Sequence, residues 1–444
     1  MNAMETLVTH IETHEGRQRT PAETFAITAA RENGLSRLLM VYIGTGLMFM
    51  LFPGTFLGVW NLMAISSHHA AGSVSPAWVQ AHGHAQIFGW IGTFIMGIGY
   101  YSIPKLRRLP WFALAAAWTS WILWTAGVTL RWLTGISPWH WRIMLPLSAA
   151  LELAAFLIFL RSVSGHRPEN AGKTRMGEWV YVVLCGSLGW LATLLVNFGA
   201  ACFVALTSAS PDLPAGFDQR FLVLETWGFL VPNVWGFSGK WLPVFLGLKP
   251  LRGRPLLGAA AVNAAGVVSA LAGLMIPAVL LLIAGSLTAI YALRLFEPSD
   301  RPAKIQGIHS SFPAFVRLAY AWEVVAAGLG IWAALVVNSH GIWGASRHAL
   351  TVGFLALMVF AIGQRVLPAF SGMRWLFSTK LMFLAMLLLS VGCFLRVGSE
   401  VLAYQGFLSS AWSWLPVSAV TEMTAVTLFA INVLVTFARR RQPE

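Results

Sequence analysis

The amino-acid sequence predicts an all-α integral membrane protein with about twelve transmembrane helices. Apolar residues make up 57% of the 444 residues and charged residues only 11%, whereas soluble globular proteins average about 45–50% and about 25%. The apolar residues lie in runs of about 20, the length that crosses the hydrocarbon core as a helix. Lys and Arg are concentrated in alternate connections between these runs. Together these observations exclude a soluble enzyme, a disordered regulator and a secreted disulfide scaffold.

The first 35 residues are polar, carry both signs of charge and lack the basic-then-apolar pattern of a signal peptide. Within them, Thr20, Pro21 and Glu23 resemble a helix start, with a hydroxyl cap, a proline in the first turn and Glu three residues after the cap. Gly34 is expected to end that helix. Residues 1–35 are therefore predicted to form a cytoplasmic segment with a short interfacial helix.

Residues 36–438 are expected to form one membrane domain, because the loops are short and no soluble insertion interrupts the apolar runs. Twelve spans are predicted, at Leu38–Trp60, His82–Ile103, Trp111–Leu130, Trp141–Leu160, Trp179–Ala205, Phe221–Leu246, Leu256–Met275, Pro277–Leu295, Phe312–Val337, Ala345–Leu367, Leu376–Leu395 and Trp412–Phe437. The seventh and eighth spans must be separate, because about 40 continuous helical residues would be about 60 Å long, twice the hydrocarbon thickness.

Basic residues orient these spans. The N-terminal segment, the C-terminal tail (439–444) and every second connection are rich in Lys and Arg, whereas the opposite side carries only Arg131, Arg142, Arg220, Arg347 and Arg396. Positive residues favour the cytoplasmic side, so both termini are predicted in the cytoplasm, with the chain in a bacterial inner membrane. The net charge of +13 is explained by contact of the basic residues with the anionic lipid surface. No nucleic-acid partner is expected.

The three cysteines lie inside apolar runs, without paired spacing or a CxxCH motif (Cys185, Cys202 and Cys393). This pattern argues against disulfides, zinc and covalently attached haem. The cysteines are predicted to be small buried side chains.

Histidines are the most informative polar residues. Seven of them fall at or near the outer ends of spans, and therefore at one depth: His68, His69, His82, His84, His140, His340 and His348. Imidazole binds iron and copper, and a histidine inside a helix bundle can hold haem axially. Their shared depth favours a cofactor site, although any single histidine there can equally bridge helices in the headgroup region.

His82 and His84 open the second span and lie about 200° apart around a helix. They are therefore expected to face two different sites. Small residues, including Gly89 and Gly97, lie below His82. They leave room either for a flat macrocycle or for a closely packed helix.

His348 lies in the first turns of the tenth span, directly after Arg347. Four outer-side arginines (Arg131, Arg142, Arg347 and Arg396) are candidates to bind haem propionates, because a guanidinium pairs with a carboxylate through two hydrogen bonds. Lipid phosphates are the alternative partners of these arginines.

Two motifs resemble the NnrS family of membrane proteins, which have about twelve spans, contain haem and copper and are linked to nitric oxide metabolism. They are His82-Gly83-His84-Ala85-Gln86-Ile87-Phe88-Gly89 and His348-Ala349-Leu350-Thr351-Val352-Gly353. The resemblance implies that His82, His84 and His348 bind the cofactors. It also implies non-covalent b-type haem, with copper as a second metal, and a small diatomic gas such as nitric oxide as ligand. His84, His68, His69 and His340 are the candidates to complete a copper site.

The second span also resembles the catalytic subunit of haem–copper oxidases and nitric oxide reductases, through Gly97-Ile98-Gly99-Tyr100-Tyr101 and Pro104 at its inner end. This resemblance implies a haem–copper-oxidase-like bundle. That superfamily needs a histidine in span six and a histidine pair at span seven, and residues 221–246 and 256–275 contain none. An oxidase of the usual kind is therefore not expected, and a shared frame with altered ligands stays an alternative.

Four carboxylates lie within spans: Glu152, Glu225, Glu323 and Glu422. Each is expected to face the bundle interior, because a charge at mid-helix costs about 2.5–3.5 kcal/mol on insertion scales. Glu225 and Glu323 are the catalytic candidates, Glu225 beside the outer site and Glu323 as a proton relay. The preferred function is a haem protein that binds a diatomic gas or passes an electron to it. The alternatives are a divergent gas reductase and a transporter with Glu225 and Glu323 as coupling sites.

Overall fold

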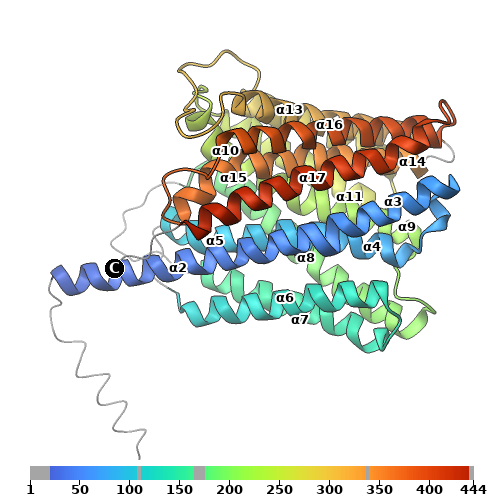
Figure 1. Cartoon of the computed structure of the whole chain (residues 1–444), viewed down its shortest axis with the longest axis horizontal. Helices are drawn as coiled ribbons and strands as arrows, with labels where there is room; N and C mark the ends of the chain where they lie inside the picture. The colour runs from blue at the N-terminus through green and yellow to red at the C-terminus, as the bar shows by residue number, and fades with distance from the viewer. Residues whose placement is uncertain (1–20, 108–111, 165–175, 337–339, 440–444) are drawn as a thin grey trace, which may run out of the picture.

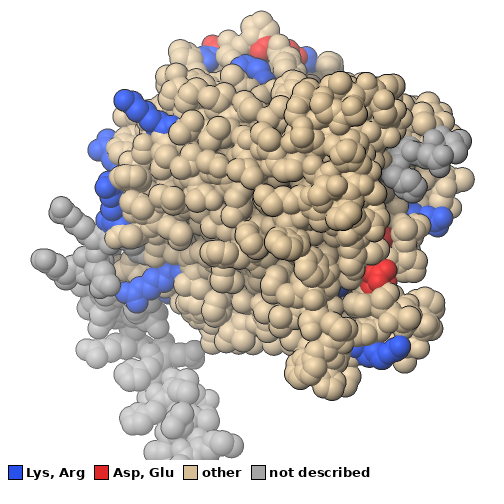
Figure 2. Space-filling view, turned by 45° about the vertical axis from the view of Figure 1, so that its right-hand side comes forward, with Lys and Arg blue, Asp and Glu red and all other residues tan. Residues whose placement is uncertain are grey.

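The computed structural model describes residues 21–107, 112–164, 176–336 and 340–439, which form helices joined by short loops, without a strand among them. The helices lie side by side along one direction, horizontal in Figure 1. Ten helices are long and apolar enough to cross a membrane. Figure 2 shows a broad face whose middle is free of charged side chains, with charged groups at its margins. The chain is a multi-pass α-helical membrane protein, as predicted.

Each predicted span corresponds to one helical pass. Eight passes are unbroken α-helices: α6 (Leu114–Ile136), α7 (Trp141–Val163), α8 (Glu178–Thr207), α11 (Gly253–Leu271), α12 (Met275–Leu293), α13 (Phe312–Leu335), α16 (Thr379–Tyr404) and α17 (Ala411–Ala438). The predicted division between the seventh and eighth spans is confirmed, because α11 and α12 are separate helices.

The other four passes each contain a π-helical segment. They are α2 (Pro21–Phe49), η1 (Met50–Phe56) and α3 (Leu57–His68); α4 (Pro76–His84), η3 (Ala85–Gly92) and α5 (Thr93–Arg107); α9 (Ala215–Val223), η4 (Leu224–Leu230) and α10 (Val231–Phe245); and α14 (His340–His348), η5 (Ala349–Ala356) and α15 (Leu357–Phe370). Two passes, α6 and α9–η4–α10, fall outside the ten candidate membrane-crossing helices.

Several predicted boundaries are wrong. Gly34 does not end a short helix, because α2 runs unbroken from Pro21 to Phe49. The third span continues past Leu130 to the end of α6, and the eleventh continues past Leu395 to the end of α16. In both cases the backbone stays helical beyond the apolar run, where polar side chains line a cavity and need no lipid-facing surface.

The small residues of the second pass serve helix packing. A Cβ added at Gly97 would lie 2.6 Å from Cβ of Tyr42, and one at Gly89 would lie 2.9 Å from Cβ of Phe49. Both contacts belong to α2, so the first and second passes approach closely along this stripe. Of the two alternatives in the sequence, the closely packed helix is therefore the one observed.

Candidate functional site

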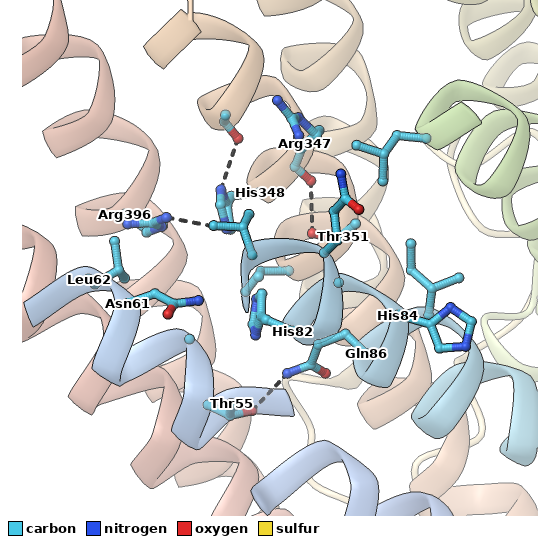
Figure 3. Close-up of a pocket in the computed structure, with 18 of the residues that line it drawn as sticks. Thr55, Asn61, Leu62, His82, His84, Gln86, Arg347, His348, Thr351 and Arg396 are labelled. Carbon is cyan, nitrogen blue, oxygen red and sulfur yellow. Dashed lines mark hydrogen bonds between the residues drawn. The ribbon is translucent and has the colours of Figure 1, made fainter. Parts of the chain in front are cut away.

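A cavity of about 330 Å³ lies inside the bundle, at the end that carries α3, α4, α9 and α14 (here called the outer end; Figures 1 and 3). Its volume falls within the range of small-molecule and cofactor sites. Among the described residues, eight of the twelve passes contribute to its walls. The four that do not are α7, α11, α12 and α13. Most of its lining surface is apolar.

All four π-helical segments contribute to the wall of this cavity. Thr55 belongs to η1, Gln86 to η3, Thr226 to η4 and Thr351 to η5, and each lines the cavity. A π-helical turn widens the helix and is frequent at functional sites. All four passes with this irregularity therefore reach the same cavity, together with four unbroken helices.

His82 presents its ring to the cavity from the end of α4 (Figure 3). Its Nδ1 lies 2.8 Å from the backbone oxygen of Gly54 in η1. A carbonyl oxygen only accepts, so Nδ1 carries the proton and Nε2 keeps its lone pair. A Cβ added at Gly58 would lie 2.6 Å from Cε1 of His82. The glycines of the first pass therefore provide both the space and the acceptor that fix this imidazole.

His348 lines the same cavity from α14 (Figure 3). Its Nδ1 lies 2.9 Å from the oxygen of Gly344 and 3.1 Å from Oε2 of Glu400. Both partners accept, so Nδ1 is again the protonated nitrogen. Nε2 lies 3.4 Å from Nη2 of Arg396, which donates to it. Two imidazoles from two different passes thus line one cavity with Nδ1 protonated. Nε2 of each is therefore the nitrogen that could bind a metal, and in His348 it would exchange the Arg396 hydrogen bond for the metal.

His84 faces away from His82, as the helical spacing predicts (Figure 3). Its Nε2 lies 2.8 Å from Oε1 of Glu152 in α7, and its ring stacks on Phe88. Asn197 donates from Nδ2 to Oε2 of Glu152 over 3.4 Å. His84 and Asn197 line the cavity, and Glu152 is fully buried behind them. The structure shows this histidine in a hydrogen-bonded pair with a carboxyl group.

Substituting Glu152 by leucine is expected to lower the free energy of unfolding by about 1–3 kcal/mol, because it leaves a buried imidazole without its partner. Unfolding in mixed detergent micelles measures the loss. The double substitution of His84 by phenylalanine and Glu152 by leucine should recover part of it, since it removes both members of the pair. Wild-type stability in the Glu152→Leu variant would contradict this account.

His68, His69 and His140 do not line the cavity. His68 is exposed, with Nδ1 2.9 Å from the oxygen of Ala64, and His69 is exposed and stacks on Trp412. His140 is also exposed, at the start of α7, and the side chain of His340 lies outside the described residues. Nowhere in the described ranges do three or more His, Cys, Asp or Glu side chains form a group able to hold a metal. The expected multi-histidine copper site is not assembled there.

The predicted arginines divide into two groups. Arg131 and Arg347 line the cavity, as does Arg396. Nε of Arg131 and both Nε and Nη1 of Arg396 are buried donors that find no hydrogen-bond acceptor in the described part of the chain. Arg142 is instead bound elsewhere, because its guanidinium donates to the backbone oxygens of Ala205 and Ser208 at the end of α8. The placement of Arg142 therefore does not fit its predicted role.

The two catalytic candidates are also separated. Glu225 lies in η4, where it is buried and lines the cavity. Glu323 lies in α13, outside the cavity lining, and accepts a hydrogen bond from Nε1 of Trp235 over 3.1 Å. Its Oε2 lacks a hydrogen-bond partner among the described residues. Only Glu225 shares the space of the histidines.

Glu400 is a residue of the site that the sequence analysis missed. It is 5% exposed, lines the cavity and contacts both His348 and Arg396. The predicted eleventh span stopped at Leu395, which left Arg396 and Glu400 in a loop. Opposite charges four residues apart are typical of one helix face, and this spacing is the signal that would have extended the helix.

Known proteins resemble this chain in fold, not in sequence. No family model matches it, and no curated protein matches it. A solved structure described as a heme-copper terminal oxidase dimer is similar to it, with a TM-score of 0.57 and 11% sequence identity over 92% of this chain and 85% of that one. The chain therefore has the fold of a haem–copper-oxidase-like membrane subunit.

Proposed function

We propose that this chain is a haem-binding membrane protein of the NnrS type, which acts in nitric oxide metabolism or in the response to nitrosative stress. The observation that carries the proposal is the pair formed by His82 and His348. They come from two passes, line one cavity and have Nδ1 committed to acceptors, which leaves Nε2 for iron. The oxidase-like fold supports haem as the group that this pair would hold.

The surrounding residues fit a haem group. Haem carries two carboxylates. Nε of Arg131 and both Nε and Nη1 of Arg396 are buried N–H donors without acceptors among the described residues, although Nη2 of Arg396 pairs with Glu400, and Arg347 also lies on the cavity wall. Burying such donors unpaired is costly, so an anionic partner would stabilise them. The apolar remainder of the lining suits a porphyrin. His82 and His348 would hold the iron, and the arginines would bind the propionates.

Bound haem would supply electron transfer, and a small diatomic gas would bind the iron in place of one of the two histidines. The protein's own contribution is to orient both imidazoles, to exclude bulk water with an apolar lining and to balance the charge of the propionates. We assign no copper site, because the histidines proposed for copper are not grouped in the described residues. Glu225, one of the carboxyl groups on the cavity wall, would exchange a proton with the cavity.

Pyridine-haemochrome and metal analysis of the purified protein test this proposal most directly. We expect b-type haem, a strong Soret band and a spectral change when nitric oxide is added. A colourless protein that stays colourless after expression with excess haem precursor would contradict it. That result would favour the transporter alternative, in which Glu225 on the cavity wall would be a coupling site.

The membrane and its orientation are part of the same proposal. We propose a bacterial inner membrane with both termini in the cytoplasm, from the excess of Lys and Arg at one end. Reporter fusions at the C-terminus should be active only with a reporter that functions in the cytoplasm.

A further inference from the structure

The two imidazoles of the cavity have unequal partners. Nδ1 of His82 contacts one neutral acceptor, the oxygen of Gly54 at 2.8 Å. Nδ1 of His348 contacts a neutral acceptor, the oxygen of Gly344, and also Oε2 of Glu400 at 3.1 Å. His348 has this additional carboxylate partner because its helix, α14, packs against α16, which carries Glu400.

The position of Glu400 indicates that its role concerns this imidazole. Its other carboxylate oxygen lies 3.1 Å from Nη2 of Arg396, one turn earlier on α16. The same arginine nitrogen lies 3.4 Å from Nε2 of His348. Glu400 therefore holds Arg396 and His348 at once. When Nε2 binds a metal, Arg396 keeps the carboxylate as a partner.

A carboxylate behind a metal-bound histidine makes the imidazole a stronger electron donor. It does so by accepting the Nδ1 proton, an effect that a neutral carbonyl produces more weakly. A stronger donor stabilises the oxidised metal and so lowers its reduction potential. Hydrogen bonds to the ring nitrogen that does not bind the metal are one of the means by which proteins set haem potentials.

We infer that Glu400 is a positioning residue that makes His348 the stronger of the two iron ligands and thereby lowers the reduction potential of the haem. This inference rests on the proposed function, because it requires haem to be bound between His82 and His348. It adds the residue that would set the electron affinity of that haem, and it assigns unequal donor strength to the two histidines that would hold the iron.

The chain offers a matched control. Glu422 in α17 is another of the carboxyl groups that line the same cavity, and no hydrogen bond joins it to either histidine in the described residues. Its Oε1 has no hydrogen-bond partner there. Glu422→Gln removes a half-buried carboxyl group from the same wall but leaves Nδ1 of His348 untouched.

The experiment compares the wild-type protein, Glu400→Gln and Glu422→Gln in redox titrations and in electron paramagnetic resonance of the oxidised form. We expect a more positive midpoint potential and altered g values in Glu400→Gln, with haem content unchanged. Glu422→Gln should keep the wild-type g values and shift the potential less. Glu400→Asp, which keeps the charge, should lie between the wild type and Glu400→Gln.

Three results would overturn the inference. They are a wild-type potential and wild-type g values in Glu400→Gln, the same changes in Glu422→Gln, or loss of haem in both Glu400 variants. The last result would make Glu400 necessary for assembly instead of for tuning. Absence of haem from the wild-type protein is a different failure, because it would contradict the proposed function before any variant is compared.

Discussion

Replacing His348 by alanine is expected to remove most of the bound haem, and replacing His82 by alanine to reduce it. Each substitution deletes a nitrogen that the structure presents to the cavity. Losing a residue behind a metal ligand typically weakens binding by about 10–100-fold, and losing the ligand itself should cost at least as much. The ratio of Soret to protein absorbance in purified variants measures the effect.

His68→Ala is the matched control for this experiment. His68 lies at the same end of the bundle but is exposed, and Ala64 and Ser67 are its hydrogen-bond partners. It should keep the wild-type haem content. Full occupancy in both His82→Ala and His348→Ala would refute the ligand assignment.

Replacing Gly189 by alanine is expected to destabilise the bundle by about 3 kcal/mol, at the upper end of the range for overpacking. A Cβ at this position in α8 would lie 1.9 Å from the backbone oxygen of Gly228 in η4. The obstacle is backbone, so no side chain can rotate away, and the fifth and sixth passes must separate. Unfolding in mixed detergent micelles measures the change.

Gly199→Ala provides the comparison within the same helix. A Cβ at Gly199 meets nothing within 4 Å, so alanine there should leave stability unchanged or raise it by up to about 1 kcal/mol. Equal stabilities of the Gly189 and Gly199 variants would show that α8 and η4 do not pack as closely as described.

Much of the fold could be predicted because a bilayer imposes a simple requirement on the sequence. Each crossing needs about 20 apolar residues, so the twelve runs, including the division between α11 and α12, are visible without any tertiary information. The ends of the helices are different. α6 and α16 continue through polar residues that face the protein interior, where hydropathy no longer reports on helix formation.

The site was predicted only in part. Helical geometry alone predicts that His82 and His84 face opposite ways, because their angular separation is fixed by the helix. Geometry within one helix cannot show that His84 meets Glu152, since the two residues lie in different passes. The same limit applies to Arg142, whose guanidinium lies within reach of the end of α8.

The sequence by itself therefore determined the membrane class, the number of helical passes and the kinds of side chain at the outer end, because these follow from hydrophobicity and helical repeat along one chain. Only the tertiary structure decided that His82 and His348 share a cavity, that His84 pairs with Glu152 and that Glu400 supports His348. The physical reason is that these contacts depend on how helices distant in sequence rotate and pack against one another. A periodicity read along one helix does not contain that information.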